Sequence, residues 1–135
     1  MRKLFGVALA ALLTLVTGPA SGYTAGEMLS KCSSFRDARE VNGAVRLVDI
    51  EAGVCFGAFL TIWETTSVVN NEKLPMLYIC APRGTTVVQF IRIFVQYAEV
   101  HPEEQHEPSF LIAADSLIRA FPCEGKTFSA TSGWK

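Results

Sequence analysis

The stretch CAPRGTTVVQFIRIFVQYAEVHPEEQHEPSFLIAADSLIRAFPC, residues 80–123, decides the fold of this chain. It holds two runs in which apolar residues recur three and four positions apart, the spacing that places side chains on one face of an α-helix. Pro102 lies between the runs, and a proline disfavours helical geometry in the residue before it. The stretch therefore predicts two helices and a short connector. Their apolar stripes are Val87, Phe90, Ile91, Phe94, Val95 and Ala98, then Phe110, Ala113, Ala114, Leu117, Ile118 and Phe121.

A cysteine stands just outside each end of this predicted helix pair. Because a short connector places neighbouring helices antiparallel, the start of the first helix should lie beside the end of the second. That arrangement brings Cys80 and Cys123 together. A disulfide there would close a loop of roughly 40 residues and add about 4 kcal/mol of stability in the chain-entropy model. The alternative is a pair of free buried thiols.

The chain contains four cysteines, and all four have a place in this scheme. An even number of cysteines in a small exported domain is typical of a disulfide framework. Four cysteines allow three pairings. The helix pair favours Cys80–Cys123, which leaves Cys32 to pair with Cys55.

The first 22 residues have the order of a secretory signal peptide. Arg2 and Lys3 precede an uncharged run over residues 4–16, and small residues follow. Such a run is short for a membrane span. We expect cleavage after Ala20 or Gly22, export, and no membrane attachment afterwards; a retained membrane anchor is the alternative.

The rest of the chain has the size and charge of one ordinary globular domain. About 113 residues remain after cleavage, which fits a single domain. The chain has 12 basic and 13 acidic residues. Their charges are interspersed, so no basic stripe for a nucleic acid is present. We expect a helical domain over residues 23–123 and a flexible tail, rich in Gly, Ser and Thr, over residues 124–135.

Two further helices are predicted before the residue 80–123 pair. Thr24 and Glu27 form a capping box, in which a hydroxyl and a carboxylate satisfy backbone N–H groups of the first turn, so a helix should run from there to about Cys32. A second helix is expected over residues 44–68. Its core seam is Val45, Val48, Ala52, Cys55, Phe59 and Ile62. The fold class is therefore all-α, a small disulfide-stabilised bundle of about four helices.

The residues do not form a recognisable catalytic set. A nucleophilic cysteine needs a free thiolate, and disulfides would use all four cysteines. His101 and His106 are five residues apart, a spacing that does not share one helix face. The run HPEEQHE could bind a metal, but a solvated connector is the favoured interpretation. We expect neither an enzyme nor a metal or other cofactor.

Four segments, in their order and spacing, resemble one known family. They are CFGAFLTI at residues 55–62, CAPRGTTVVQF at 80–90, VQYAEVHPE at 95–103 and SLIRAFPC at 116–123. Together they span about residues 24–123 and resemble the Rap/Tai family of type VI secretion immunity proteins. The resemblance implies a periplasmic, all-helical and often dimeric protein. Its partner would be a secreted amidase that cleaves peptidoglycan, whose active-site groove it occludes.

Occlusion needs a protruding surface rather than catalytic residues, and two polar segments are candidates. The first is the loop at residues 70–75, with Asn70, Asn71, Glu72 and Lys73. The second is the connector at residues 101–107, with His101, Glu103 and Glu104. Either segment could instead be a plain connector.

Two other classes of function remain open. One is a small helical periplasmic chaperone that exposes an apolar dimer face at low pH. The other is a carrier that holds a lipid-like ligand in its helical core. A domain of this family could also serve a purpose other than toxin neutralisation.

Overall fold

The computed structural model describes residues 22–42, 44–71 and 73–124. The predicted signal peptide and tail lie almost wholly outside these residues, and Glu72 is outside them too. The described chain forms α2 (Ala25–Cys32), α3 (Ile50–Thr65), α4 (Val87–Val100) and α5 (Ser109–Ala120). Single 3-10 turns follow α2 and α4, at Ser33–Phe35 and Pro102–Glu104. No strand occurs in this part of the chain beyond isolated bridges, so the predicted all-α class is confirmed.

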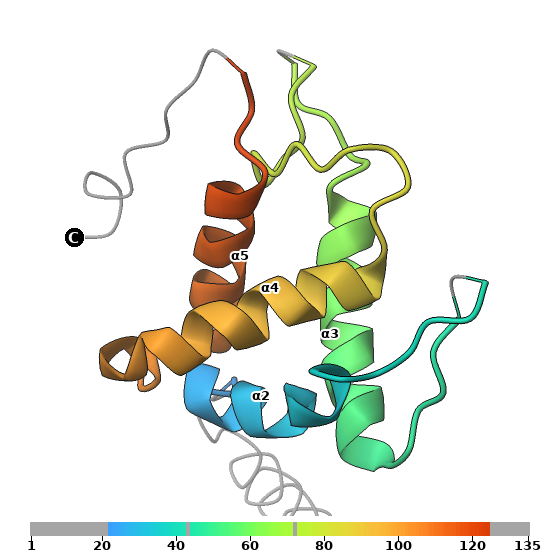
Figure 1. The fold of residues 1–135 in the computed structure, drawn as a ribbon. Coiled ribbons are helices and arrows are strands. Elements are labelled where there is room, and N and C mark those ends of the chain that lie inside the picture. The colour runs from blue at the N-terminus through green and yellow to red at the C-terminus, as the bar shows by residue number, and fades with distance from the viewer. Residues whose placement is uncertain (1–21, 43, 72, 125–135) are drawn as a thin grey trace, which may run out of the picture.

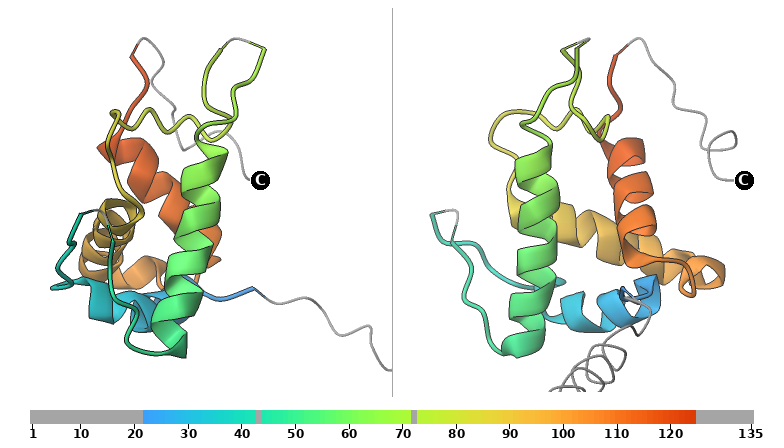
Figure 2. Two further views of the ribbon diagram at one scale, coloured as in Figure 1. Left: turned by 90° about the vertical axis from the view of Figure 1, so that its right-hand side faces the viewer. Right: turned by 180° about the vertical axis from the view of Figure 1, so that it is seen from behind.

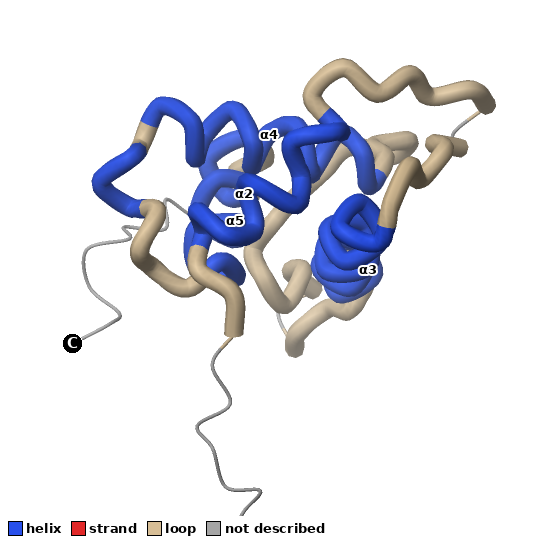
Figure 3. The backbone as a smooth tube through the Cα atoms, turned by 90° about the horizontal axis from the view of Figure 1, so that it is seen from below, coloured by secondary structure: helices blue, strands red, loops and turns tan. Residues whose placement is uncertain are grey.

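The other three described helices pack around α4. Figure 1 shows α4 crossing the molecule, with α3 and α5 standing at its two sides and α2 below it. Helix α2 contacts each of the other three helices. Seen from below in Figure 3, α3 lies beside the group that α2, α4 and α5 form. No helix within the described ranges is long and apolar enough to span a membrane.

The start of α2 follows the predicted capping signal, and α4 starts with the same motif. Thr24 caps α2 and Thr86 caps α4, and each forms a complete capping box with the residue three positions later. The predicted helix over residues 44–68 is too long, since α3 begins at Ile50. Asp49 is its cap, with a side-chain oxygen that accepts from the N–H of Ala52 at 2.7 Å. The apolar spacing continued on both sides of Asp49, so the sequence did not reveal this cap. Val48, which the prediction placed in the core seam, is 69% exposed.

The predicted antiparallel arrangement of α4 and α5 is wrong in its angle. Figures 1 and 2 show α5 crossing α4 steeply. The connector between them is attached to the start of α2, where the N–H of Ala25 donates to the carbonyl of Glu107 at 2.8 Å. Helix α2 also packs against both α4 and α5. The start of α4 still meets the end of α5, with the rings of Phe90 and Phe121 5.7 Å apart.

Both predicted disulfides are present. Cys32–Cys55 joins α2 to α3, and Cys80–Cys123 joins the segment before α4 to the segment after α5. No other cysteine remains among the described residues. The pairing survives the change in helix angle because the residues between Cys80 and α4 reach across to the end of α5 (Figure 2).

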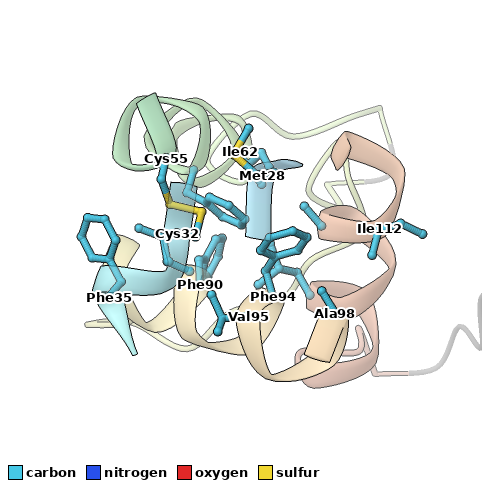
Figure 4. Packing of buried hydrophobic residues seen from close by; sticks show 14 of the residues in the cluster. Met28, Cys32, Phe35, Cys55, Ile62, Phe90, Phe94, Val95, Ala98 and Ile112 are labelled. Atoms are coloured by element: carbon cyan, nitrogen blue, oxygen red, sulfur yellow. A yellow bond between two sulfur atoms is a disulfide. The ribbon is translucent and has the colours of Figure 1, made fainter. Parts of the chain in front are cut away.

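The core is formed by all four described helices and contains several buried aromatic rings. Phe59 of α3 and Phe94 of α4 are fully buried, with ring centres 5.2 Å apart. Figure 4 shows Cys32 and Cys55 within the same cluster. Every residue of the predicted α4 stripe except Val87 is buried.

The predicted stripe of α5 is only partly correct. Phe110 was placed in the core but is 52% exposed, whereas Ser116 is buried. The hydroxyl of Ser116 donates to the carbonyl of Ala113 at 2.8 Å, which satisfies the buried group and allows a serine to face the core. The buried face is Ile112, Ala113, Ser116 and Leu117.

Replacing Gly57 by alanine is expected to stabilise the fold. Gly57 lies inside α3, and a Cβ added there would meet nothing within 4 Å. Alanine favours a helix interior over glycine by about 1 kcal/mol. Urea denaturation should therefore show a free energy of unfolding that is higher by about that amount. An unchanged or lower value would contradict the open environment described for this position.

Candidate functional site

The two predicted contact segments lie at different ends of the molecule. The loop at residues 70–75 projects beyond the end of α3, at the top of Figure 1, and the connector at residues 101–107 lies at the lower left. Figure 2 shows the same separation from two other directions. The structure therefore does not combine them in one surface, and each has to be considered alone.

The first segment is a small hairpin, residues 68–76, which we call the α3–α4 hairpin. The N–H of Met76 donates to the carbonyl of Val68, and the N–H of Asn70 to that of Leu74, both at 2.8 Å. The side-chain oxygen of Asn70 also accepts from the N–H of Leu74 at 3.0 Å. Lys73 has φ of 61°, the left-handed conformation of a tight turn. These hydrogen bonds fix the shape of the hairpin in the unbound protein.

The flanks of the α3–α4 hairpin expose apolar side chains that the sequence did not identify as a surface. Val68, Val69 and Met76 are 49%, 58% and 56% exposed. Large exposed apolar groups gathered on a protruding element are typical of protein contact sites. The sequence contains the apolar pair Val68-Val69, but the helix predicted over residues 44–68 ends at this pair. The pair was therefore interpreted as the end of that helix.

The connector is bound to the body of the protein. The His101 ring stacks on the Tyr97 ring at 4.2 Å, and its Nδ1 lies 3.0 Å from a carboxylate oxygen of Glu103. The Gln105 amide donates to the carbonyl of Ala98 at 2.9 Å. A hydrogen bond from the Glu103 backbone, and then one from His101, lowers the pKa of the exposed Glu103 carboxyl.

Three side chains of the connector could in principle share a metal ion. His101, Glu103 and Glu104 offer ligand atoms within 4.8 Å of one another. His101 and Glu103 already contact each other, and Glu103 is largely exposed. This geometry is that of a hydrogen-bonded surface pair at the end of α4, so we assign no metal to it.

Tyr97 belongs to a polar cluster between α4 and α5. Its hydroxyl donates to a carboxylate oxygen of Asp115 at 3.2 Å, and Nε of Arg119 donates to the same oxygen at 2.7 Å. Asp115 and Arg119 are four residues apart on α5 and form an ion pair, which Tyr97 joins from α4. Burial raises the pKa of Tyr97 well above its usual value, and a hydrogen bond with Glu104 and the charge of Asp115 act in the same direction.

This raised pKa predicts a loss of stability at high pH. The folded chain holds the phenolic proton of Tyr97 more tightly than the unfolded chain does. The contribution is therefore complete below the unfolded pKa of about 10 and is lost as the pH rises above it. Denaturation across this range should show Tyr97→Phe losing less stability than the parent chain. Equal losses in the two proteins, or a phenolate absorbance that titrates at the ordinary pKa, would contradict the assignment.

An apolar groove lies between α3 and α5. It has a volume of about 320 Å³ and no charged lining residue. The exposed ring of Phe110 borders this groove. The sequence prediction placed Phe110 in the core, so it did not indicate a groove here. The lining residues are Met28, Ala58, Phe59, Thr61, Ile62, Thr65, Leu77, Ser109, Phe110 and Ala113.

Comparison with known proteins identifies a family. A family model described as Rap1a immunity proteins matches residues 18–123, which is more than half of the chain. The matched range contains all four helices and both disulfides. No curated protein and no solved structure matches the chain.

Proposed function

The chain belongs to the family of Rap1a immunity proteins, and we propose that it neutralises a peptidoglycan-cleaving amidase of a type VI secretion system. It would bind this effector in the periplasm and occlude its active-site groove, which protects the producer from its own toxin and that of sister cells. The predicted signal peptide at residues 1–22 supports this location.

The observation that carries the proposal is the α3–α4 hairpin. It protrudes from the helical body (Figures 1 and 2) and is held by its own hydrogen bonds. A preformed element loses little conformational freedom on binding, so more of the contact energy appears as affinity. We propose that the exposed flanks bury apolar surface against the groove walls, while Asn70, Asn71 and Lys73 at the tip face the polar active site. Glu72, the remaining residue predicted to make contact in this loop, is outside the described residues.

The connector is the second candidate contact surface. His101, Glu103 and Glu104 would form a polar contact there. Their side chains are engaged with one another and with Tyr97, which favours a structural role. We therefore rank the connector below the α3–α4 hairpin.

A cell-protection assay tests the proposal. Bacteria that export the cognate amidase to the periplasm should lyse, and co-expression of this chain should prevent lysis. The same chain without residues 1–22 should be made but should give no protection, because it stays in the cytoplasm while the amidase acts in the periplasm. Lysis that continues despite full export of the chain would contradict the proposed function.

The apolar groove favours one alternative, a carrier of a lipid-like ligand. Its uncharged lining and volume would suit an acyl chain better than a polar molecule. Native mass spectrometry of protein purified from the periplasm would show a bound mass. The chaperone alternative instead predicts that the protein keeps an unrelated aggregating protein soluble at low pH.

We also propose that the protein forms a homodimer, as the resemblance implies. Light scattering on the purified chain tests this state directly. A monomer at all concentrations would refute the dimer and leave the occlusion mechanism unaffected.

A further inference from the structure

The α3–α4 hairpin sits in a long connection, whose far end is bound to α3 by a hydrogen bond from the Trp63 indole N–H to the carbonyl of Thr85 at 3.0 Å. Residues 66–86 separate α3 from α4. One side of the connection continues directly from α3, where the N–H of Thr66 donates to the carbonyl of Ile62 at 3.1 Å. The other side must be fixed where the chain returns to the body, at Ile79, which is 1% exposed, and Cys80.

The return side is attached to the end of α5. The N–H of Cys80 donates to the carbonyl of Phe121 at 2.9 Å, and the Cys80 sulfur bonds to Cys123. The Cys123 sulfur also lies 3.4 Å from the carbonyl oxygen of Tyr78. Tyr78 has φ of 54°, a left-handed conformation that a side-chain-bearing residue rarely adopts without support from its surroundings. The attachment to α5 thus begins two residues after the hairpin ends at Met76.

The other disulfide has a different position. Cys32 and Cys55 are both fully buried and join α2 to α3 inside the aromatic cluster (Figure 4). Neither residue belongs to the connection that carries the hairpin. The two bonds are therefore placed for two separate tasks.

We propose that Cys80 and Cys123 are positioning residues for effector recognition: their bond fixes the return side of the α3–α4 hairpin, whereas Cys32–Cys55 holds the core. This inference rests on the proposed function only for the identity of the partner. Without the bond, the return side keeps the Cys80 backbone hydrogen bond, the buried Ile79 side chain and the packing of Leu77 against the core. The hairpin would then sample more orientations, and a partner would have to select one of them.

Hydrogen exchange tests the positioning role without any partner. The two double variants Cys80→Ser/Cys123→Ser and Cys32→Ser/Cys55→Ser are compared with the parent chain. All three carry Gly57→Ala and are measured in sucrose, which favours the folded state. The amides of Leu74 and Met76 report on the hairpin, and those of Phe94 and Val95 on α4.

We expect the hairpin amides to exchange at least about tenfold faster than in the parent chain when Cys80 and Cys123 are replaced. Replacing Cys32 and Cys55 should leave the hairpin rates as in the parent chain, because these amides exchange by local opening, even though the α4 amides exchange faster as overall stability falls. Hairpin rates that are the same in all three proteins would overturn the proposal, as would a larger increase in the Cys32–Cys55 variant. If the Cys80–Cys123 variant does not fold in sucrose, the bond is needed for folding itself, and that also overturns a purely positioning role.

Binding to the amidase separates this inference from the proposed function. If the parent chain binds, the Cys80–Cys123 variant should bind at least about tenfold more weakly, and the Cys32–Cys55 variant about equally while it is folded. Equal affinities for the parent and the Cys80–Cys123 variant would refute the positioning role alone. A parent chain that does not bind the amidase would refute the proposed function, while the exchange result would still decide the positioning role.

Discussion

Reduction of both disulfides is expected to unfold the protein at moderate temperature. The bonds close loops of 23 and 43 residues. In the chain-entropy model these loops contribute about 3 and about 4 kcal/mol, because each bond restricts the unfolded chain. A domain of this size has a total stability of roughly 5–15 kcal/mol, so the combined loss is a large part of it.

Circular dichroism with and without dithiothreitol measures this effect. We expect a large fall in the melting temperature and loss of helical signal in the reduced sample. The double variant Cys32→Ser/Cys55→Ser provides the intermediate case, since it retains the longer loop. An unchanged melting temperature after complete reduction, verified by thiol titration, would contradict two structural bonds.

Charges placed on the flanks of the α3–α4 hairpin are expected to abolish protection. Val69 and Met76 are more than half exposed, so Val69→Asp/Met76→Asp should leave the fold intact. If these side chains enter the amidase groove, two desolvated carboxylates would oppose binding. We expect the Kd to rise at least about 100-fold, which corresponds to about 2.8 kcal/mol.

Two matched variants control for the change itself. Ile50→Asp places the same charge at a side chain that is 86% exposed, far from the hairpin at the start of α3. Val100→Asp does so beside the connector, at 69% exposure. Isothermal titration with the amidase should show parent-like affinity for both. If only Val100→Asp weakens binding to the amidase, the contact surface is the connector and not the α3–α4 hairpin.

Local signals in the sequence predicted much of this fold. The capping box at Thr24, the end of α4 before Pro102 and the disulfide pairing all appear as predicted. Each is a short-range pattern or depends on one loop closure. The start of α3 failed because the cap at Asp49 lay inside an apolar spacing that continued past it.

Features that depend on how helices meet were less accessible from the sequence. The angle between α4 and α5 is set with α2 packed against both helices, and no single segment encodes that contact. Phe110 is exposed because of the same arrangement. Its place in the predicted apolar stripe of α5 required a neighbouring helix over this side chain, and the arrangement does not provide one. The candidate site shows the same limit. The polar tip was predicted, but its exposed valines resembled a helix end and were overlooked.

Titration of the amidase with the purified chain tests the proposed occlusion most directly. Release of peptide from peptidoglycan is followed while the chain is added to a fixed amount of the cognate amidase, sought first in the adjacent reading frame. Occlusion by a preformed hairpin predicts that hydrolysis stops once each amidase has bound one copy, and that Val69→Asp/Met76→Asp does not stop it. An amidase that stays fully active within a stable complex would contradict the account.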